Sequence, residues 1–218
     1  MAIRKKNILG KLSGRLADTT TRIRYGKEVI YALPDKVKVS KSPAAKSARK
    51  KFGLTVNFAK FVNSIPDLSA VWKAAKIPGV NSYQRLIKHN AKLTGETSLS
   101  INNIITPPGK LPRPLNGSCE DGNITIGIDS KLQSRLPVIL HSVLYFYGPA
   151  ENNLEDFCLE YIRRAINDFE GNDTAVSLEL NEPQKLLFKK YNRCMLYSGL
   201  TSSREKIEWS STLSFTIK

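Results

Sequence analysis

The basic residues of the first 51 positions are the side chains whose type and spacing best suit a chemical task, the binding of a polyanion. Each Lys or Arg that meets a phosphate releases condensed counterions, so such binding depends steeply on salt and carries little sequence information. We predict three contacting groups: an N-terminal group (Arg4, Lys5, Lys6, Lys11 and Arg15), a hairpin group (Arg22, Arg24 and Lys27) and a dense helical group (Lys46, Arg49, Lys50 and Lys51).

The charge of the chain is concentrated in one half. Residues 1–95 hold 21 Lys+Arg against 4 Asp+Glu, a net charge of +17, whereas residues 96–218 hold 13 against 15, a net charge of −2. This asymmetry indicates an anionic partner for the first half. The alternative is a solvated cationic face that only keeps the protein soluble. Tyr25 and Tyr31 are expected to pack, with stacking on bases as the alternative.

Composition excludes two classes of protein. Hydrophobic residues make up 41% of the chain, which is enough for a core, so a disordered chain is excluded. No run reaches the ~20 consecutive apolar residues that a membrane-spanning helix needs. The length of 218 residues suits one or two domains.

Acid–base and metal chemistry have few candidate residues. The two histidines, His89 and His141, lie in different halves, whereas a metal site needs three or four donors. The adjacent carboxylates Glu120-Asp121 and Glu155-Asp156 fall in apparent loops, where solvated turns explain them. The chain also lacks the phosphate-loop, dinucleotide, nucleophile-elbow and metalloprotease motifs. We therefore expect a protein that is not an enzyme, with no metal site and no cofactor.

Three cysteines, Cys119, Cys158 and Cys194, lie far apart in the sequence. An odd number cannot form a complete disulfide framework, so we expect free thiols. Residues 1–10 carry charges but neither the apolar stretch nor the cleavage pattern of a secretory signal. We expect the protein in the cytoplasm or within a virion or other large particle.

The N-terminal half predicts an arm, a hairpin and three helices. Residues 1–21 show no sustained period and predict an extended basic arm. Residues 22–33 alternate around Gly26-Lys27, which predicts a two-stranded hairpin. Helices are expected from Ser42-Pro43, with Phe52 on the apolar face, from Pro66, and from Ser82 to near Gly95.

After Gly95 the period of the apolar residues changes to two, which predicts strands. The clearest alternation covers 207–217, and 138–147 is apolar on both faces, as in a central strand. Segment 157–166 fits either a strand or a helix. The prolines of 106–114 predict a stiff connection. Further strands are expected at 99–105, 123–128, 175–180 and 186–197.

The expected fold class is α+β: a basic arm with a hairpin and a small helical module, followed by an immunoglobulin-like β-sandwich. We predict an extended basic arm at 1–21, a basic hairpin and helical module at 22–95, and a β-sandwich domain at 96–218. The count of about seven strands with turn signals between them favours the sandwich. The paired cysteines of antibody domains are lacking.

Short motifs along most of the chain resemble those of a bacterial family. They read ILGKLSG, RYGKEVIYALP, SPAAKSARKKF, NSYQRLIKHN, ITPPGKL and VLYFYGP. With them the chain resembles an uncharacterised family that is common in Bacteroidetes and carries a domain of unknown function. Its association with phage-type virion genes implies a structural, virion-like role. The family has Trp before the hairpin glycine, where this chain has Tyr25. It has Gln and Asn-Pro around the Ala/Arg-rich helix, where this chain has Lys41-Ser42-Pro43 and Lys46. The extra cations imply adaptation to a polyanion.

Two functions are therefore expected. The first is a non-enzymatic structural subunit of a large assembly, such as a virion, shell or filament, whose basic half contacts other copies, assembly proteins or a polyanion. The alternative is a protein that binds the RNA or DNA backbone through its basic half. The direction of the cations distinguishes the two, because one continuous face with interleaved aromatic rings favours nucleic acid. Neither a membrane nor a small-molecule substrate is expected as partner.

Overall fold

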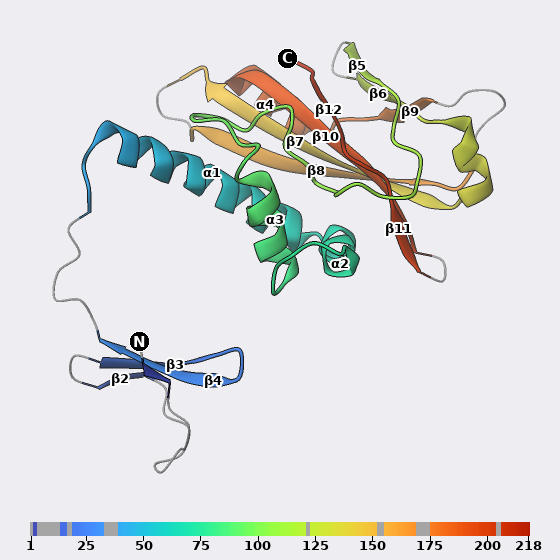
Figure 1. Cartoon of the computed structure of the whole chain (residues 1–218). Coiled ribbons are helices and arrows are strands. Elements are labelled where there is room, and N and C mark those ends of the chain that lie inside the picture. Colours follow the sequence, from blue (N-terminus) through green and yellow to red (C-terminus); the bar gives the residue numbers. More distant parts are fainter. Residues whose placement is uncertain are drawn as a thin grey trace. The chain divides into compact units, whose positions relative to one another are not determined.

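The structure is a computed structural model that describes residues 2–3, 14–16, 19–32, 39–120, 123–151, 155–168, 175–203 and 206–218. The chain forms two compact units that divide between Ser42 and Pro43. Helices and sheets are both present, which confirms the α+β class (Figure 1).

The N-terminal unit is an antiparallel sheet with the strand order β1-β4-β3-β2. Strands β3 and β4 form the predicted hairpin. Its two-residue loop is Tyr25-Gly26, one position earlier than predicted, and φ is positive at both residues, as a tight hairpin turn requires. The four strands are β1 (Ala2–Ile3), β2 (Gly14–Leu16), β3 (Thr19–Arg24) and β4 (Lys27–Ala32).

The extended arm predicted at 1–21 is not confirmed. Its described residues lie in β1, β2 and the start of β3, and each of these strands is paired. Ala2 pairs with Ile30, which lies far along the sequence. A strand held by such a distant partner needs no regular period of its own, so the sequence of the segment did not indicate it.

Three helices open the C-terminal unit, and each begins where predicted. They are α1 (Pro43–Ser64), α2 (Pro66–Ala74) and α3 (Ser82–Asn90). Proline suits the first turn of α1 and α2, because the missing N–H has no helical partner there. The Asn81 side chain accepts a hydrogen bond from the Gln84 backbone N–H at 2.8 Å and caps α3.

A five-stranded antiparallel sheet forms the centre of this unit. Its order is β11-β10-β7-β8, and β12 also pairs with β10. β7 is central, as predicted, and segment 157–166, which fitted either a strand or a helix, is a strand. The strands are β7 (Val138–Pro149), β8 (Phe157–Ile166), β10 (Tyr191–Ser203), β11 (Ile207–Trp209) and β12 (Leu213–Thr216).

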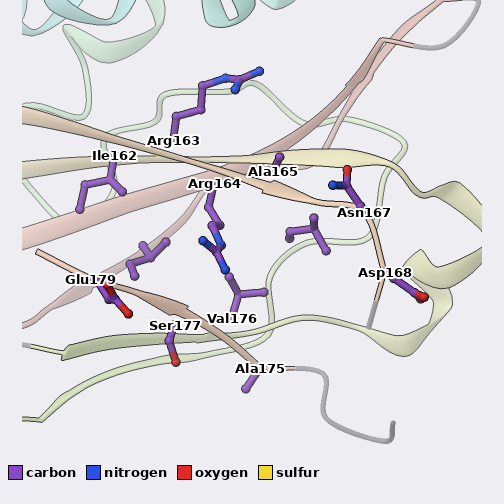
Figure 2. A pocket seen from close by; sticks show the side chains of 12 residues that line it. Ile162, Arg163, Arg164, Ala165, Asn167, Asp168, Ala175, Val176, Ser177 and Glu179 are labelled. Carbon is purple, nitrogen blue, oxygen red and sulfur yellow. The ribbon is translucent and has the colours of Figure 1, made fainter. Parts of the chain in front are cut away.

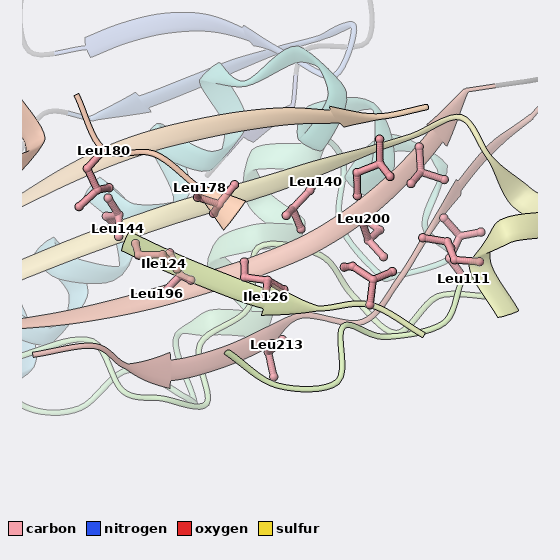
Figure 3. Close-up of a cluster of buried hydrophobic side chains, with 14 of the residues drawn as sticks. Leu111, Ile124, Ile126, Leu140, Leu144, Leu178, Leu180, Leu196, Leu200 and Leu213 are labelled. Carbon is pink, nitrogen blue, oxygen red and sulfur yellow. The ribbon is translucent and has the colours of Figure 1, made fainter. Parts of the chain in front are cut away.

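A small sheet and two helices cover one face of the central sheet. The small sheet has the order β5-β6-β9. Leu140 of β7 and Leu196 of β10 pack in one core with Ile124 and Ile126 of β6 (Figure 3). The covering elements are β5 (Gly117–Glu120), β6 (Asn123–Gly127), β9 (Ala175–Leu178), the 3₁₀ helix η1 (Ser130–Arg135) and α4 (Glu182–Lys190).

Helices α1 to α3 cover the other face. Val143 and Tyr145 of β7 pack in a second core with Phe58 of α1 and Trp72 of α2. The boundary that we predicted between 95 and 96 therefore lies inside one unit, because the helices share this core with the strands. The sheets are sandwich-like, but the immunoglobulin-like arrangement is not confirmed.

Three predicted strands differ in the structure. Segment 99–105 is built of turns, because the Asn103 side chain accepts from the Ser100 N–H at 2.8 Å and takes the place of a strand partner. The start of 186–197 belongs to α4, which Asn181 and Gln184 cap reciprocally. The last strand is divided into β11 and β12, where Thr212 Oγ1 accepts from the Ile105 N–H at 3.0 Å.

Candidate nucleic-acid interface

One face of the N-terminal sheet gathers the predicted hairpin cations. Arg22 pairs with Val29, and Thr20 pairs with Tyr31. Paired residues, and residues two apart along a strand, share a face of an antiparallel sheet. Arg22, Lys27 and Tyr31 therefore lie on one face, which we call the cationic face. The register places positions 15 and 24 on the same face, because Arg15 pairs with Thr20 and Arg24 with Lys27.

An aromatic ring lies among the cations of this face. The guanidinium carbon of Arg22 is 5.9 Å from the centre of the Tyr31 ring, within reach of a cation–π contact. Arg22 and Lys27 are exposed, Tyr31 is half-buried, and Val29 is buried. Tyr25 adds a second ring at the hairpin loop, where its side chain is 71% exposed. The arrangement offers charge for phosphates and a flat ring for a base.

The helical group of cations belongs to the other unit. Lys46, Arg49 and Lys50 are exposed in the first turns of α1, and Lys51 is half-buried. The buried residues of α1 begin only at Leu54, so this end of the helix projects from the core. Its first turn holds no acidic residue, and its dipole adds positive potential there.

Two details modify the helical group. Phe52 was predicted on the buried face, but its side chain is 58% exposed, because the core contacts of α1 start after it. Lys50 Nζ lies 3.7 Å from Asp156 Oδ2, and both side chains are largely exposed. An exposed pair of this kind is weak and gives way readily to a phosphate.

The remaining predicted residues are only partly covered by the structure. Arg4, Lys5, Lys6 and Lys11 lie outside the described residues. Arg15 and Arg24 are placed by their backbone pairing. The structure thus brings the hairpin group together on one face and the helical group together on one helix, in two separate units.

A buried polar cluster around His141 was not anticipated as a group. His141 of β7 faces the Tyr161 hydroxyl at 2.7 Å through Nδ1 and Thr201 Oγ1 at 2.8 Å through Nε2. Burial lowers the pKa of His141 to about 4, against the attraction of Asp67, whose Oδ2 lies 4.0 Å from Nε2. The ring is therefore neutral at neutral pH and links β7 to β8 and β10. The sequence showed only a histidine within an expected strand, and its partners lie on two other strands.

Two hollows lie on opposite faces of the C-terminal end of β8. One has a volume of about 590 Å³ and is lined by β8 and β9; Figure 2 shows Arg163 and Arg164 extending to opposite sides of β8. The other has a volume of about 440 Å³ and includes Ile139, Arg163 and Thr201 in its lining. The second hollow thus adjoins the hydroxyl that contacts His141.

Among the described residues, no three His, Cys, Asp or Glu side chains come together as a metal site would require. No helix in the same part of the chain has the length and apolar character to cross a bilayer. No disulfide joins Cys119, Cys158 and Cys194, as expected from their odd number.

No family model, curated protein or solved structure matches this chain. The resemblance to the bacterial family remains an expectation from the motifs. The cationic face and the projecting end of α1 are therefore the features that indicate a function.

Proposed function

We propose that this protein binds the phosphate backbone of a nucleic acid through the cationic face of its N-terminal sheet. The observation that carries the proposal is the placement of Arg22 and Lys27 on one face with the Tyr31 ring. Cations on one face can contact successive phosphates of a strand, and an interleaved ring can stack on a base between them.

The proposed contact reads the backbone rather than the bases. Phosphate contacts position a protein but carry no sequence information. With the positions of Arg15 and Arg24, four cations occupy the face by register. Four phosphate contacts on a single strand predict a slope of log affinity against log salt of roughly −3. The exposed cations at the start of α1 supply a second contact from the other unit.

Salt titrations of the full chain with a fluorescent single-stranded oligonucleotide test this proposal. The double variant Arg22→Ser/Lys27→Ser is expected to bind more weakly and to reduce the salt slope by about 1.4, or about 0.7 per lost phosphate contact. Lys110→Ser/Lys131→Ser is the matched control, because both of its lysines are exposed in the C-terminal unit. An unchanged slope in the hairpin variant would refute the proposed face.

A ring substitution separates stacking from charge. Tyr31→Leu removes the aromatic surface but no cation, so single-strand affinity is expected to fall while the salt slope stays constant. A fall of about five- to 160-fold corresponds to the 1–3 kcal/mol measured for one stacked base. Equal affinities of the variant and the wild-type chain would remove Tyr31 from the interface.

The helical group is tested by a separate triple variant. Arg49→Ser/Lys50→Ser/Lys51→Ser is expected to weaken binding and reduce the slope, since its residues lie near the projecting end of α1. Binding that stays unchanged would confine the interface to the N-terminal sheet.

A structural subunit of a larger assembly is the second candidate. The observation that favours it is the unpaired outer edge of β8, since among the described strands β8 pairs only with β7. In this proposal the partners are other copies of the chain or assembly proteins, as expected from the motifs. An edge of this kind accepts a strand from another molecule.

A further inference from the structure

Strand β8 offers ten residues for pairing at the edge of the central sheet. It is paired along its whole length with β7, from Phe157 opposite Tyr147 to Ile166 opposite Val138, and no other described strand pairs with it. Natural proteins protect such edges with charged side chains, proline or bulges. β8 reads FCLEYIRRAI, with no proline and with charges of both signs.

We infer that two copies of this chain associate by antiparallel pairing of their β8 strands across a two-fold axis at Ile162. A two-fold axis perpendicular to the sheet keeps its two faces continuous, so residues of one face meet residues of the same face. With Ile162 on the axis, Glu160 lies opposite Arg164 of the second copy. Symmetry makes the same contact twice.

The charges of β8 select this register over its neighbours. An axis at Glu160 places two carboxylates opposite each other, and an axis at Arg163 or Arg164 places two guanidinium groups opposite each other. An axis at Tyr161 brings no opposite charges together. Only the axis at Ile162 gives two Glu–Arg contacts without a like-charge contact, and cross-strand pairs of opposite charge stabilise a sheet.

On the face toward helices α1 to α3, the same register also brings matching side chains of the two copies together. Tyr161 lies opposite Arg163 of the second copy, a combination suited to a cation–π contact. The Arg163 side chain is exposed, and its Nε lies 3.7 Å from Asp67 Oδ2 at the start of α2.

The large hollow beside β8 gains a cover in this dimer. Its lining includes Arg164 and Ile166 of β8 and Val176 of β9 (Figure 2). In the proposed register, Cys158 and Glu160 of the second copy lie opposite Ile166 and Arg164. The pairing thus closes a recess of about 590 Å³ that the single copy leaves open.

Sedimentation equilibrium of the nuclease-treated full chain tests the inference. The wild-type chain is expected to form a reversible dimer of twice the 24.4 kDa chain mass. Arg164→Glu and Glu160→Arg each create two like-charge contacts, and each is expected to weaken dimerisation at least roughly tenfold. Mixing the two variants restores both opposite-charge contacts and is expected to restore the dimer. Lys131→Glu and Glu96→Arg are matched controls at exposed positions away from β8.

A cross-link tests the register independently of affinity. Only the residue on the axis meets its own copy, and directly opposed Cβ atoms lie about 5 Å apart. Ile162→Cys is therefore expected to form a disulfide-linked dimer under mild oxidation, located by peptide mass spectrometry, whereas Leu159→Cys is not. A wild-type chain that stays monomeric at every concentration, charge variants that still dimerise, or equal cross-linking of both cysteine variants would each overturn the inference.

This inference goes beyond nucleic-acid binding and can fail separately from it. Arg164→Glu changes only the C-terminal unit, so the monomeric variant is expected to keep the salt slope of oligonucleotide binding. Loss of the dimer with that slope intact supports the β8 pairing, whatever the oligonucleotide affinity of the wild-type chain.

Discussion

Replacement of His141 by Gln is expected to remove a pH-dependent part of the stability of the C-terminal unit. The ring is buried, and burial lowers its pKa from 6.5 to about 4. At pH values between these two pKa values, the imidazole is protonated in the unfolded chain but neutral in the folded protein. The free energy of unfolding therefore falls as the pH falls from about 6.5 to about 4, and this contribution is fully present above that range.

The size of the effect follows from the shift. A difference of one pKa unit corresponds to 1.36 kcal/mol, so the whole contribution is about 3 kcal/mol. Roughly 2–3 kcal/mol of it is lost between about pH 7.5 and pH 4.5. The groups that face the ring are Asp67, which raises its pKa, Arg163, which lowers it, and the hydroxyls of Tyr161 and Thr201.

Urea unfolding of the wild-type chain and of His141→Gln across this pH range is the assay. At pH 7.5 the variant is expected to be less stable by about 1–3 kcal/mol, because buried hydroxyls lose their partner. The difference in the free energy of unfolding between the two chains should narrow toward pH 4.5, because the wild-type chain loses most of the pH-dependent contribution of His141 there. His89→Gln on α3 is the control, because it replaces the other histidine of the chain, whose side chain is only half-buried whereas that of His141 is buried. Parallel pH profiles of the wild-type chain and His141→Gln would refute the reasoning.

Three further substitutions test the packing. Arg85 donates hydrogen bonds to the carbonyls of Trp72, Lys73 and Ala75 at the end of α2, at 2.8, 2.8 and 3.0 Å. Arg85→Ala is therefore expected to lower the free energy of unfolding by about 1.5–3 kcal/mol in urea titrations. Lys88→Ala, at an exposed position of α3, is the control and is expected to change it little. In Gly109→Ala the new Cβ would lie 2.0 Å from the Trp209 carbonyl oxygen, so thermal melts should show lower stability. In Gly53→Ala, inside α1, the new Cβ meets nothing within 4 Å, so the free energy of unfolding should rise by about 0.5–1 kcal/mol. Destabilisation at Gly53, or none at Gly109, would contradict the packing.

The helix starts were predictable because their signals are local. Pro43 and Pro66 stand at the first position of the helices that they open, and Asn81 caps α3 from the residue before it. Strand β1 was missed because its partner, Ile30, lies far along the chain. Helix α4 was missed because its apolar residues also fit a strand, although Asn181 and Gln184 carried a capping signal.

The candidate interface was only partly readable from the sequence. The alternation of Arg22 with Arg24 already placed both on one side of a strand. Their position relative to Tyr31 depended on the turn: a loop at Gly26-Lys27 would pair Arg22 with Tyr31, whereas the observed loop pairs it with Val29 and moves Lys27 onto the face. The partners of His141 were not readable, because Tyr161 and Thr201 lie 20 and 60 residues away.

Strand β7 contributes alternate side chains to two different cores, with Leu144 in one and Tyr145 in the other. Loosening of either layer therefore weakens the strand on which the other layer rests, so the layers open together as one cooperative unit. Amide protons of β7 and β10 are then released to solvent only when the whole unit unfolds. The amide protons of the N-terminal sheet belong to a separate compact unit, so they exchange with solvent at rates set by the unfolding of that sheet alone.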